Sequence, residues 1–308
     1  MKKKTISIAG VNTLLGQLLL QRLVRIPSVT IMSLHDRLAE NERGAISQSE
    51  QWRVDPEVLE EVKHIPLLPP SAKPLATLLL SFLPEQGAGE IESKHLRDGT
   101  RLITHCEYAR LIAPMVCPNV LPDPDPWASY LVTPNCTTVI CASPLHYIHE
   151  AHGIESVTIT TLQAISGTDL PGLQAYRIHD QVIGQVDQEA CALTEELGRI
   201  FNNAFSIDVF ATRVPVWQGH TITLSLTLKR NKTIAAVEKT LRSAPGIRID
   251  LGEQWTQCRW ESCRGDDSIA IVTELREGQH SVLITLKGDN LGSATIGIME
   301  QALNMLEV

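Results

Sequence analysis

The stretch that decides the fold is residues 5–16, TISIAGVNTLLG. Residues 5–9 alternate polar and apolar side chains, which predicts a β-strand, and the glycine-bounded turn at 10–16 leads into an amphipathic segment at 17–24 that predicts a helix. Residues 29–34 predict a second strand. A strand, a glycine turn at a helix start and a second strand form the opening unit of a dinucleotide-binding sheet, so we expect an α/β domain.

The glycine turn departs from the usual glycine-rich pattern at one position. Gly10 allows the tight turn and Gly16 allows close helix packing, but Thr13 replaces the middle glycine. The threonine side chain either obstructs a bound pyrophosphate or donates its hydroxyl to it. An incomplete glycine turn also fits a simple strand-to-helix connection, so by itself it does not establish nucleotide binding.

The rest of the first half continues the alternation of strands and helices. Residues 76–83 are an apolar run of strand length, as expected for a parallel strand covered on both faces. Residues 87–96 predict a helix and 101–104 another strand, and the proline-rich segment 111–127 predicts an inter-domain connection. The chain up to about residue 131 therefore predicts a doubly wound, Rossmann-type domain.

A second pattern follows the helix that is expected to begin near residue 136. Strict alternation of polar and apolar residues predicts strands at 156–162, 221–228 and 281–286, and helical character marks 180–201, 234–241 and 291–306. Strands whose apolar side chains all lie on one side are typical of a mostly antiparallel sheet with one covered face. The fold class is thus an α/β Rossmann-type dinucleotide-binding domain joined to an α+β domain.

Composition and charge exclude several classes of protein. The 308 residues carry a net charge of −8 without a long basic run, so we expect neither nucleic acid nor a membrane surface as a partner. No apolar run approaches the roughly 18 residues of a membrane helix. The seven cysteines are an odd number without paired C-x-x-C spacing, so we expect no metal site and a reducing, cytoplasmic location.

Residues 132–138, VTPNCTT, place a cysteine at the start of a helix. Asn135 is a good N-cap, so Cys136 falls in the first helical turn. Free N–H groups and the positive end of the helix dipole stabilise an anion there, which lowers a thiol pKa below its usual value of about 8.5 and favours the nucleophilic thiolate. The alternative is that Cys136 is a small buried residue without a chemical role.

Three other polar residues lie where strands are expected to end or begin. Gln163 follows the strand at 156–162, and Arg213 and His220 bracket residues 214–219. A histidine can act as acid and base toward a cysteine nucleophile, and an arginine can bind a substrate carboxylate with two hydrogen bonds. Taken singly, each also fits a plain role, as a turn residue, a solvated charge or a surface histidine.

Together these segments resemble the active-site signatures of aspartate-semialdehyde dehydrogenases, in the family's order and at similar spacing. The three segments are PNCTT at 134–138, TTLQAISG at 160–167 and RVPVWQGHT at 213–221. Shorter segments resemble the archaeal and fungal branch or the opening of the family's C-terminal helix: SFLP at 81–84, AGEIE at 88–92, LPG at 170–172 and DNL at 289–291. Residues 35–75 match the family poorly.

The resemblance implies a two-domain chain and a defined chemistry. It implies a Rossmann-like dinucleotide-binding domain at 1–131 with 288–308 and a catalytic and dimerisation domain at 132–287, in a homodimer or a tetramer. The resemblance implies that Cys136 attacks a carbonyl carbon and that hydride transfer to NADP then gives a thioester. It also implies that phosphate cleaves this thioester to an acyl phosphate. The biosynthetic direction reduces β-aspartyl phosphate to aspartate semialdehyde.

The resemblance also implies roles for individual residues. His220 matches the acid and base residue, Gln163 the residue that orients the intermediate, Arg213 the arginine that binds the substrate carboxylate, and Arg110 a phosphate-binding arginine. The further positions in the substrate site are Asn135 and Glu189. The positions in the cofactor site are Gly10, Thr13, Leu14, Gly16, Ser166, Gly167 and Asn290, with Arg37 as the nearest candidate for the 2′-phosphate of NADP.

The departures from the family pattern cluster on the cofactor and phosphate sides. Asp169 adds a negative charge beside the nicotinamide pocket, Ala192 stands where the family has a lysine, and Glu107 lies near the phosphate site. Asp36, beside Arg37, is able to bind a ribose hydroxyl and so to favour NAD.

Three interpretations remain open. The chain is an active dehydrogenase with altered substrate or cofactor use, or a homologue that lost or changed this activity and acts on another acyl substrate or as a binding protein. The third interpretation is an acyl-CoA or N-acetylglutamyl-phosphate reductase.

Overall fold

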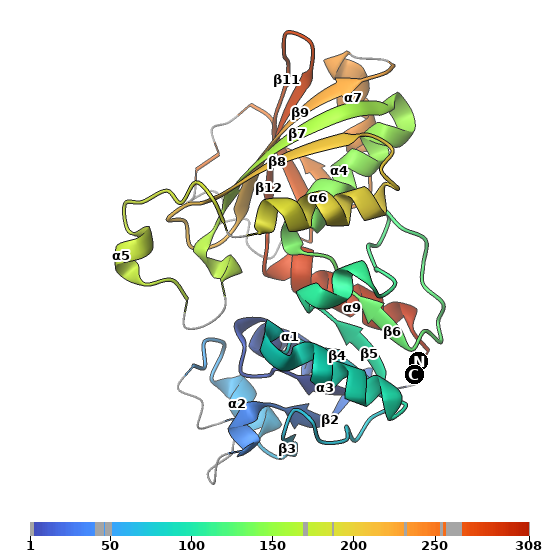
Figure 1. The fold of residues 1–308 in the computed structure, drawn as a ribbon, viewed down its shortest axis with the longest axis vertical. Coiled ribbons are helices and arrows are strands. Elements are labelled where there is room, and N and C mark those ends of the chain that lie inside the picture. The colour runs from blue at the N-terminus through green and yellow to red at the C-terminus, as the bar shows by residue number, and fades with distance from the viewer. Residues whose placement is uncertain are drawn as a thin grey trace.

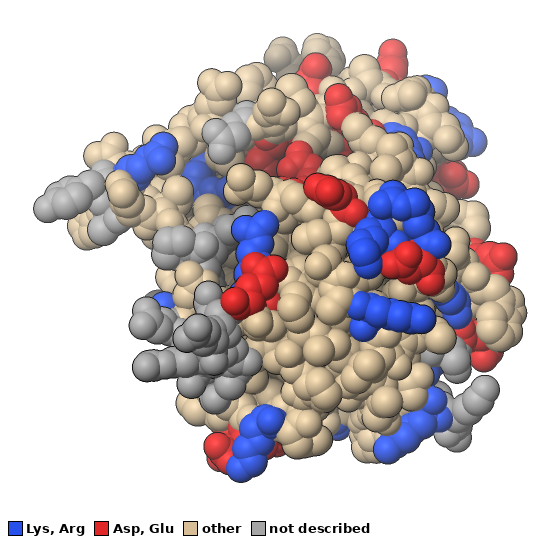
Figure 2. Space-filling view, turned by 60° about the horizontal axis from the view of Figure 1, so that its bottom comes forward, with Lys and Arg blue, Asp and Glu red and all other residues tan. Residues whose placement is uncertain are grey.

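The computed structural model describes residues 3–40, 46, 51–168, 172–186, 188–230, 233–252, 255–256 and 267–307. These residues form two six-stranded sheets, each with its own helices, and the two ends of the chain lie near each other (Figure 1). On the face shown in Figure 2, acidic and basic side chains lie intermixed rather than in separate patches.

The first sheet is parallel throughout, in the order β3-β2-β1-β4-β5-β6. Its strands are β1 (Lys4–Ala9), β2 (Val29–His35), β3 (Leu67–Leu68), β4 (Leu78–Ser81), β5 (Arg101–Thr104) and β6 (Tyr130–Val132). From β1 the chain adds strands first toward one edge of the sheet, as β2 and β3, and then toward the other edge, as β4, β5 and β6. Ligands of such sheets bind at the carboxyl ends of the strands near this switch point between β1 and β4.

In the part of the chain that the structure describes, four helices lie beside this sheet: α1 (Leu14–Leu23), α2 (Glu57–Val62), α3 (Glu85–Arg97) and α9 (Gly297–Met305). The same half contains the short 3₁₀ helices η1 (Arg37–Glu40) and η3 (Glu107–Leu111). The last helix returns to the first sheet, because Met299 and Leu303 belong to the same buried apolar cluster as Ile6 and Leu19. This packing agrees with the expectation that the C-terminal segment completes the first domain. The exact domain limits stay a prediction.

The second sheet is mixed, in the order β10-β11-β12-β9-β7-β8. Its strands are β7 (Ile154–Gln163), β8 (Ser206–Arg213), β9 (His220–Leu228), β10 (Ile247–Ile249), β11 (Ala270–Glu277) and β12 (Val282–Gly288). The pairs β11–β12, β12–β9 and β9–β7 are antiparallel, whereas β10–β11 and β7–β8 are parallel. The expected α/β fold with a second, mostly antiparallel sheet is confirmed.

Helices α4 (Cys136–His152), α6 (Glu189–Ile200) and α7 (Ile234–Arg242) cover one face of the second sheet and bury a common apolar core with it (Figure 1). Phe210, which is on β8 and 63% exposed, points away from this core, and Trp217, in the loop between β8 and β9, is 65% exposed. A short helix, α5 (Ala175–Ile178), lies on an arm that projects from this half of the molecule (Figure 1).

Two expected helices differ from the structure. The segment 180–201 is helical only from Glu189, because Ile183 instead pairs with Arg213 in an isolated β-bridge. The final helix does not run evenly from residue 291. It opens with a π-helical turn, η5 (Gly292–Ile296), in which the Asp289 carboxylate accepts hydrogen bonds from the N–H groups of residues 291 and 292.

Candidate active site

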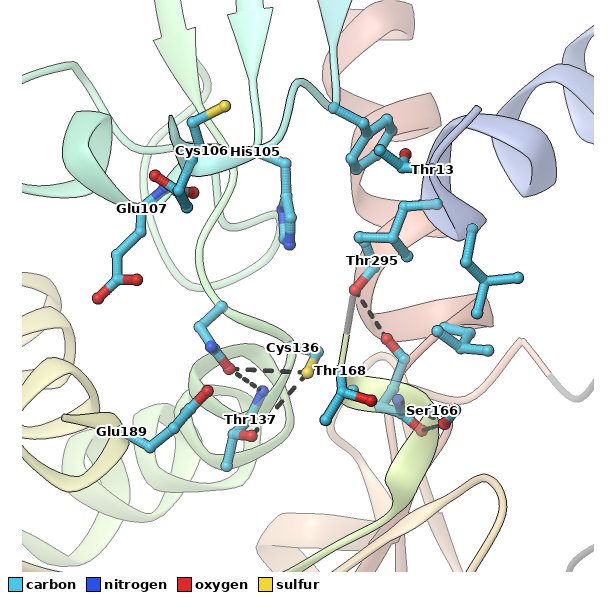
Figure 3. Close-up of a pocket in the computed structure, with 18 of the residues that line it drawn as sticks. Thr13, His105, Cys106, Glu107, Cys136, Thr137, Ser166, Thr168, Glu189 and Thr295 are labelled. Carbon is cyan, nitrogen blue, oxygen red and sulfur yellow. Dashed lines mark hydrogen bonds between the residues drawn. The ribbon is translucent and has the colours of Figure 1, made fainter. Parts of the chain in front are cut away.

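A pocket of about 250 Å³ lies between the two sheets and is lined by residues from both (Figure 3). Cys136 lies between Thr13 and His105 on the side of the first sheet and Glu189 and Ser166 on the other side. Among the predicted site residues, the pocket is lined by Thr13, Leu14, Arg110, Asn135, Cys136, Gln163, Ser166, Gly167, Glu189, Arg213, His220 and Asn290. Gly10, Gly16 and Arg37 do not line it.

Strand register explains why three of these residues meet. Gln163 and Arg213 end the neighbouring parallel strands β7 and β8, and they are register partners. His220 begins β9, on the other side of β7, after Gly219 turns the chain with a positive φ of 90°. The sheet therefore presents the amide, the guanidinium and the imidazole at one end of three adjacent strands.

The thiol of Cys136 lies at the first turn of α4, as expected. Asn135 is the N-cap, and its Oδ1 accepts a hydrogen bond of 2.8 Å from the Thr137 N–H. The Cys136 Sγ lies 3.6 Å from Nε2 of His220 and 3.6 Å from the Asn135 Oδ1. The thiol and the imidazole are thus in direct contact.

A backbone hydrogen bond sets the tautomer of His220. The N–H of Ala164 lies 3.1 Å from Nδ1 of His220. Because a backbone N–H can only donate, Nδ1 must be the unprotonated nitrogen, and in the neutral ring the proton is on Nε2. The ring therefore presents an N–H donor to the sulfur of Cys136.

The protonation states differ from the sequence expectation. Burial raises the pKa of Cys136 to about 12, with a further contribution from the charge of Glu189. Burial, and then the charge of Arg213, lower the pKa of His220 to about 3. The expected lowering of the Cys136 pKa at the helix start is therefore not met, since the pKa shifts upward with burial as its largest cause. The resting pair is a neutral thiol and a neutral imidazole.

Arg213 and Gln163 are held within this pocket. Arg213 is 5% exposed, and its Nη1 donates to the carbonyl oxygen of Ala164 over 2.8 Å. A Cβ at Gly167 would lie 3.0 Å from this nitrogen, so the glycine gives the guanidinium room. Nε2 of Gln163 makes long contacts of 3.4 Å with Thr137 Oγ1 and 3.5 Å with an oxygen of Glu189.

Arg110 has a buried partner that the sequence analysis missed. Its Nη1 lies 3.3 Å from Oε1 of Glu196, and both side chains are buried. A signal for Glu196 was available in the sequence, because it shares the helical spacing of the buried residues Leu193, Leu197 and Ile200. A charged residue on such a face needs a partner.

The glycine turn between β1 and α1 packs closely against neighbouring backbone, and Thr13 caps the start of α1. A Cβ at Gly10 would lie 2.1 Å from the carbonyl oxygen of Phe82, and one at Gly16 would lie 2.1 Å from that of Gly10. Oγ1 of Thr13 accepts from the Gly16 N–H over 3.0 Å and donates to the Gly10 carbonyl over 2.8 Å. The hydroxyl is therefore a helix cap, and its proton is already engaged.

Arg37 lines a second groove, which shares Thr13 and residues 83–85 with the first pocket. Its Nη2 donates to the carbonyl oxygen of Gln86 over 3.1 Å. Asp36 lies beside it, and its two carboxylate oxygens accept from the N–H groups of Asn12 and Leu38 over 3.0 and 3.1 Å. The two grooves together run past the start of α1, so the residues present fit an extended dinucleotide.

The remaining predicted positions have mixed outcomes. Asn290 uses its side chain to join two loops, because it accepts from the Gly219 N–H over 3.0 Å and donates to Ser166 Oγ over 3.1 Å. Ala192 and Glu107 lie with Arg110 in an adjoining hollow. Asp169 falls outside the described residues. Within the described part of the chain, no group of three or more His, Cys, Asp or Glu side chains could hold a metal, and no helix is long and apolar enough to cross a membrane.

Comparisons with known proteins agree with this geometry. Residues 144–292 match the family described as semialdehyde dehydrogenase, dimerisation domain. The chain is 26% identical over 265 residues to an aspartate-semialdehyde dehydrogenase of Archaeoglobus fulgidus, covering 78% of this chain and 76% of the relative. It is 25% identical over 227 residues to a malonyl CoA reductase (NADP) of Metallosphaera sedula, covering 65% and 64%.

Two solved structures share the fold over nearly the whole chain. Aspartate semialdehyde dehydrogenase II of Vibrio cholerae, complexed with ASA, matches with a TM-score of 0.81 at 19% identity over 99% of this chain and 98% of that one. The Candida albicans enzyme with NADP matches with a TM-score of 0.81 at 20% identity over 99% and 100%. The two structures confirm the fold class, the family match and the curated relatives confirm the resemblance, and the roles of individual residues stay predictions.

Proposed function

We propose, on the premise that residues 144–292 form a semialdehyde dehydrogenase dimerisation domain, that this protein is an NADP-dependent phosphorylating semialdehyde dehydrogenase. One observation carries the proposal: the Cys136 sulfur lies 3.6 Å from Nε2 of His220, in a pocket that Gln163 and Arg213 also line and that meets a second groove at Thr13. Its substrates are aspartate semialdehyde, phosphate and NADP, or β-aspartyl phosphate and NADPH in the biosynthetic direction.

Cys136 acts as the nucleophile. Its sulfur adds to the carbonyl carbon of the semialdehyde, the thiol proton leaves to solvent, and a thiohemiacetal alkoxide forms. The Nε2–H of His220 donates to the negative charge, first on sulfur and then on the carbonyl oxygen, which stabilises the transition state where the charge develops. His220 therefore acts as a hydrogen-bond donor, not as the acceptor of the thiol proton.

Arg213 and Gln163 fix the substrate relative to the sulfur. The guanidinium of Arg213 lines the pocket beside Cys136, where its Nη1 donates to the carbonyl oxygen of Ala164. A substrate carboxylate bound there places the aldehyde at the thiol. Such orientation lowers the activation free energy by several kcal/mol. The amide of Gln163 contacts the same helix turn and orients the intermediate.

NADP, when bound in the two grooves, supplies a hydride acceptor, and NADPH supplies a donor in the reverse direction. Thr13, Leu14 and Ser166 line the end near the thiol, and Arg37 lies where it can meet a 2′-phosphate. Loss of hydride from the thiohemiacetal carbon leaves a thioester on Cys136. A phosphate oxygen, positioned by Arg110, attacks the thioester carbon, the C–S bond breaks, and the acyl phosphate leaves Cys136 as a thiolate.

We further propose a homodimer in the cytoplasm. Leu162 on β7 and Phe210 on β8 expose apolar side chains, as does Trp217 in the loop between β8 and β9, and a second copy would cover them. The free cysteines among the described residues fit a reducing compartment. A molar mass of about twice that of the chain by light scattering would agree with a dimer, and a monomer at micromolar concentration would contradict it.

A second candidate is reduction of a different acyl donor. Glu107 and Ala192 lie in the hollow around Arg110. Compared with the family pattern, the hollow therefore has one additional carboxylate and lacks the lysine at position 192. The Metallosphaera sedula relative is a malonyl CoA reductase (NADP). Product identification with acyl phosphates and acyl-CoA thioesters, offered in parallel with NADPH, separates the two candidates.

The direct test uses aspartate semialdehyde, phosphate and NADP, with NADPH absorbance as the readout. We expect turnover by the wild-type protein and a loss of at least about 10³-fold in Cys136→Ser, because a hydroxyl with a far higher pKa replaces the nucleophile. Cys191→Ser, which changes an exposed cysteine, should keep full activity. No NADPH with a panel of semialdehydes, or unimpaired turnover by Cys136→Ser, would refute the proposed function.

A further inference from the structure

The carboxylate of Glu196 is buried in the second half of the molecule but contacts a group from the first half. Glu196 is 1% exposed and lies on the apolar face of α6. Burying a charged carboxylate costs several kcal/mol unless partners replace its water, so its contacts must be strong ones. These contacts all lead to the pocket that holds Cys136.

The two oxygens of Glu196 join three separate groups. Oε1 accepts from Nη1 of Arg110 over 3.3 Å, and Oε2 accepts from the Asn135 N–H over 2.8 Å and from Thr138 Oγ1 over 2.7 Å. Arg110 belongs to η3, beside the parallel sheet, whereas Asn135 and Thr138 flank Cys136 at the start of α4. A single side chain thus joins the guanidinium to the turn that carries the thiol.

A second residue of the same helix fixes the backbone of η3. Arg199, three positions after Glu196, donates through Nη1 to the carbonyl oxygen of Arg110 and through Nη2 to that of Ala113 over 2.6 Å. Nη2 of Arg110 also donates to the carbonyl oxygen of His105 over 2.9 Å. The guanidinium of Arg110 is therefore held at both terminal nitrogens, and its main chain is held as well.

We infer that Glu196 is a positioning residue for anion binding: its bridge from Arg110 to the start of α4 sets the place of the guanidinium relative to the Cys136 sulfur. The inference rests on the proposed function in assigning phosphate to Arg110. A carboxylate that holds both groups fixes where a phosphate oxygen lies when it attacks a thioester on Cys136. Glu196 acts through Arg110 and α4 and does not itself line the pocket.

The inference predicts a selective defect. In Glu196→Gln the amide oxygen can still accept from α4, but the charge that holds Arg110 is lost. Because a charge-assisted hydrogen bond is lost, we expect the KM for phosphate to rise about tenfold or more. The KM for the semialdehyde should stay within about twofold, because Arg213 is not part of the bridge. Glu195→Gln, which removes the same charge from an exposed neighbour on α6, should behave as wild type.

A double-mutant cycle with Arg110→Lys separates positioning from general loss of stability. If Glu196 acts through Arg110, the double variant should raise the phosphate KM no more than about twofold beyond the worse single variant. The inference would be overturned if the phosphate KM of the double variant rose by the product of the two single-variant increases. Equal increases in the KM values for phosphate and semialdehyde would also overturn it.

A second readout does not depend on dehydrogenase activity. Inorganic phosphate bound at Arg110 should slow alkylation of Cys136 by iodoacetamide, followed by mass spectrometry, and Glu196→Gln should require about tenfold more phosphate for the same protection. If no semialdehyde is oxidised but this protection and its loss are seen, the proposed function fails and the inference stands. Absence of protection in the wild type, or equal protection in Glu196→Gln, overturns it.

Discussion

The end of the mixed sheet and the loops of the parallel sheet bring polar groups to one pocket in different ways. Gln163, Arg213 and His220 lie on three adjacent strands, so backbone register places them. Thr13 and Arg110 lie in connections that follow β1 and β5, where each side chain depends on its own hydrogen-bond partners rather than on strand register. The strand-held groups can therefore act without rearrangement, whereas the loop-held groups must share or exchange a bond when a ligand arrives.

This difference predicts that substitutions in the strand-held group cost more activity than those in the loop-held group.

The largest effect concerns the N–H donor of His220. His220→Ala should lower kcat by about 10²–10³-fold, the usual loss for removal of one oxyanion donor. His220→Gln, which keeps an N–H donor near the sulfur, should recover at least about tenfold of that loss. Steady-state NADPH formation measures both. Equal defects in the two variants would mean that His220 acts as a base and that the tautomer set by Ala164 does not matter.

The second prediction concerns the pH dependence of Cys136. With its pKa raised to about 12 and that of His220 lowered to about 3, the thiolate fraction should rise about tenfold per pH unit between about pH 6 and pH 9. The rate of alkylation by iodoacetamide should follow that slope. A rate that is flat above about pH 6 would instead indicate a preformed thiolate, which the helix-start pattern favours.

The third prediction moves to the loop-held side. Arg37→Ala should raise the Kd for NADP about tenfold, through loss of a charge-assisted bond to the 2′-phosphate, and leave the Kd for NAD within about twofold. Arg22→Ala, at an exposed ion pair on α1, is the matched control. Calorimetry with both cofactors measures this. If NAD already binds the wild type more tightly than NADP, Asp36 and not Arg37 decides the preference.

The smallest effect is expected at Thr13. Thr13→Ala should lower the free energy of unfolding by about 1 kcal/mol through loss of the α1 cap, whereas Thr13→Gly should lose only a few tenths. Urea unfolding measures the difference, and the Kd for NADP should change by less than about twofold in both. A weakened NADP affinity with unchanged stability would show that the hydroxyl serves the pyrophosphate rather than the helix.

The sequence predicted the strand-held group well because short motifs and strand ends suffice to place it. Strand β8 escaped prediction because it lies at the edge of its sheet and leaves Phe210 exposed, so its residues lack the clean alternation of β9. The pKa of Cys136 was predicted in the wrong direction. Its value depends on burial by residues distant in sequence, which a local helix-start argument does not include.

The loop-held group was only partly predictable. Arg110 was identified, but its partner Glu196 lies 86 positions away and on a different sheet's helix, so neither local pattern nor motif joins the two. The substitution at Thr13 left two interpretations open, and the structure favours a third, in which the hydroxyl caps α1. Side-chain partners in loops are set by tertiary contacts, and a single sequence does not encode them in any local spacing.

In the proposed mechanism Cys136 carries the acyl group between hydride transfer and phosphate attack. This role can be measured by mixing the protein with aspartate semialdehyde and NADP, without phosphate, and following NADPH and protein mass together. We expect a burst of about one NADPH per chain, a thioester adduct on the peptide that contains Cys136, and renewed turnover when phosphate is added. NADPH formation without an adduct on Cys136, or an adduct that phosphate does not release, would contradict it.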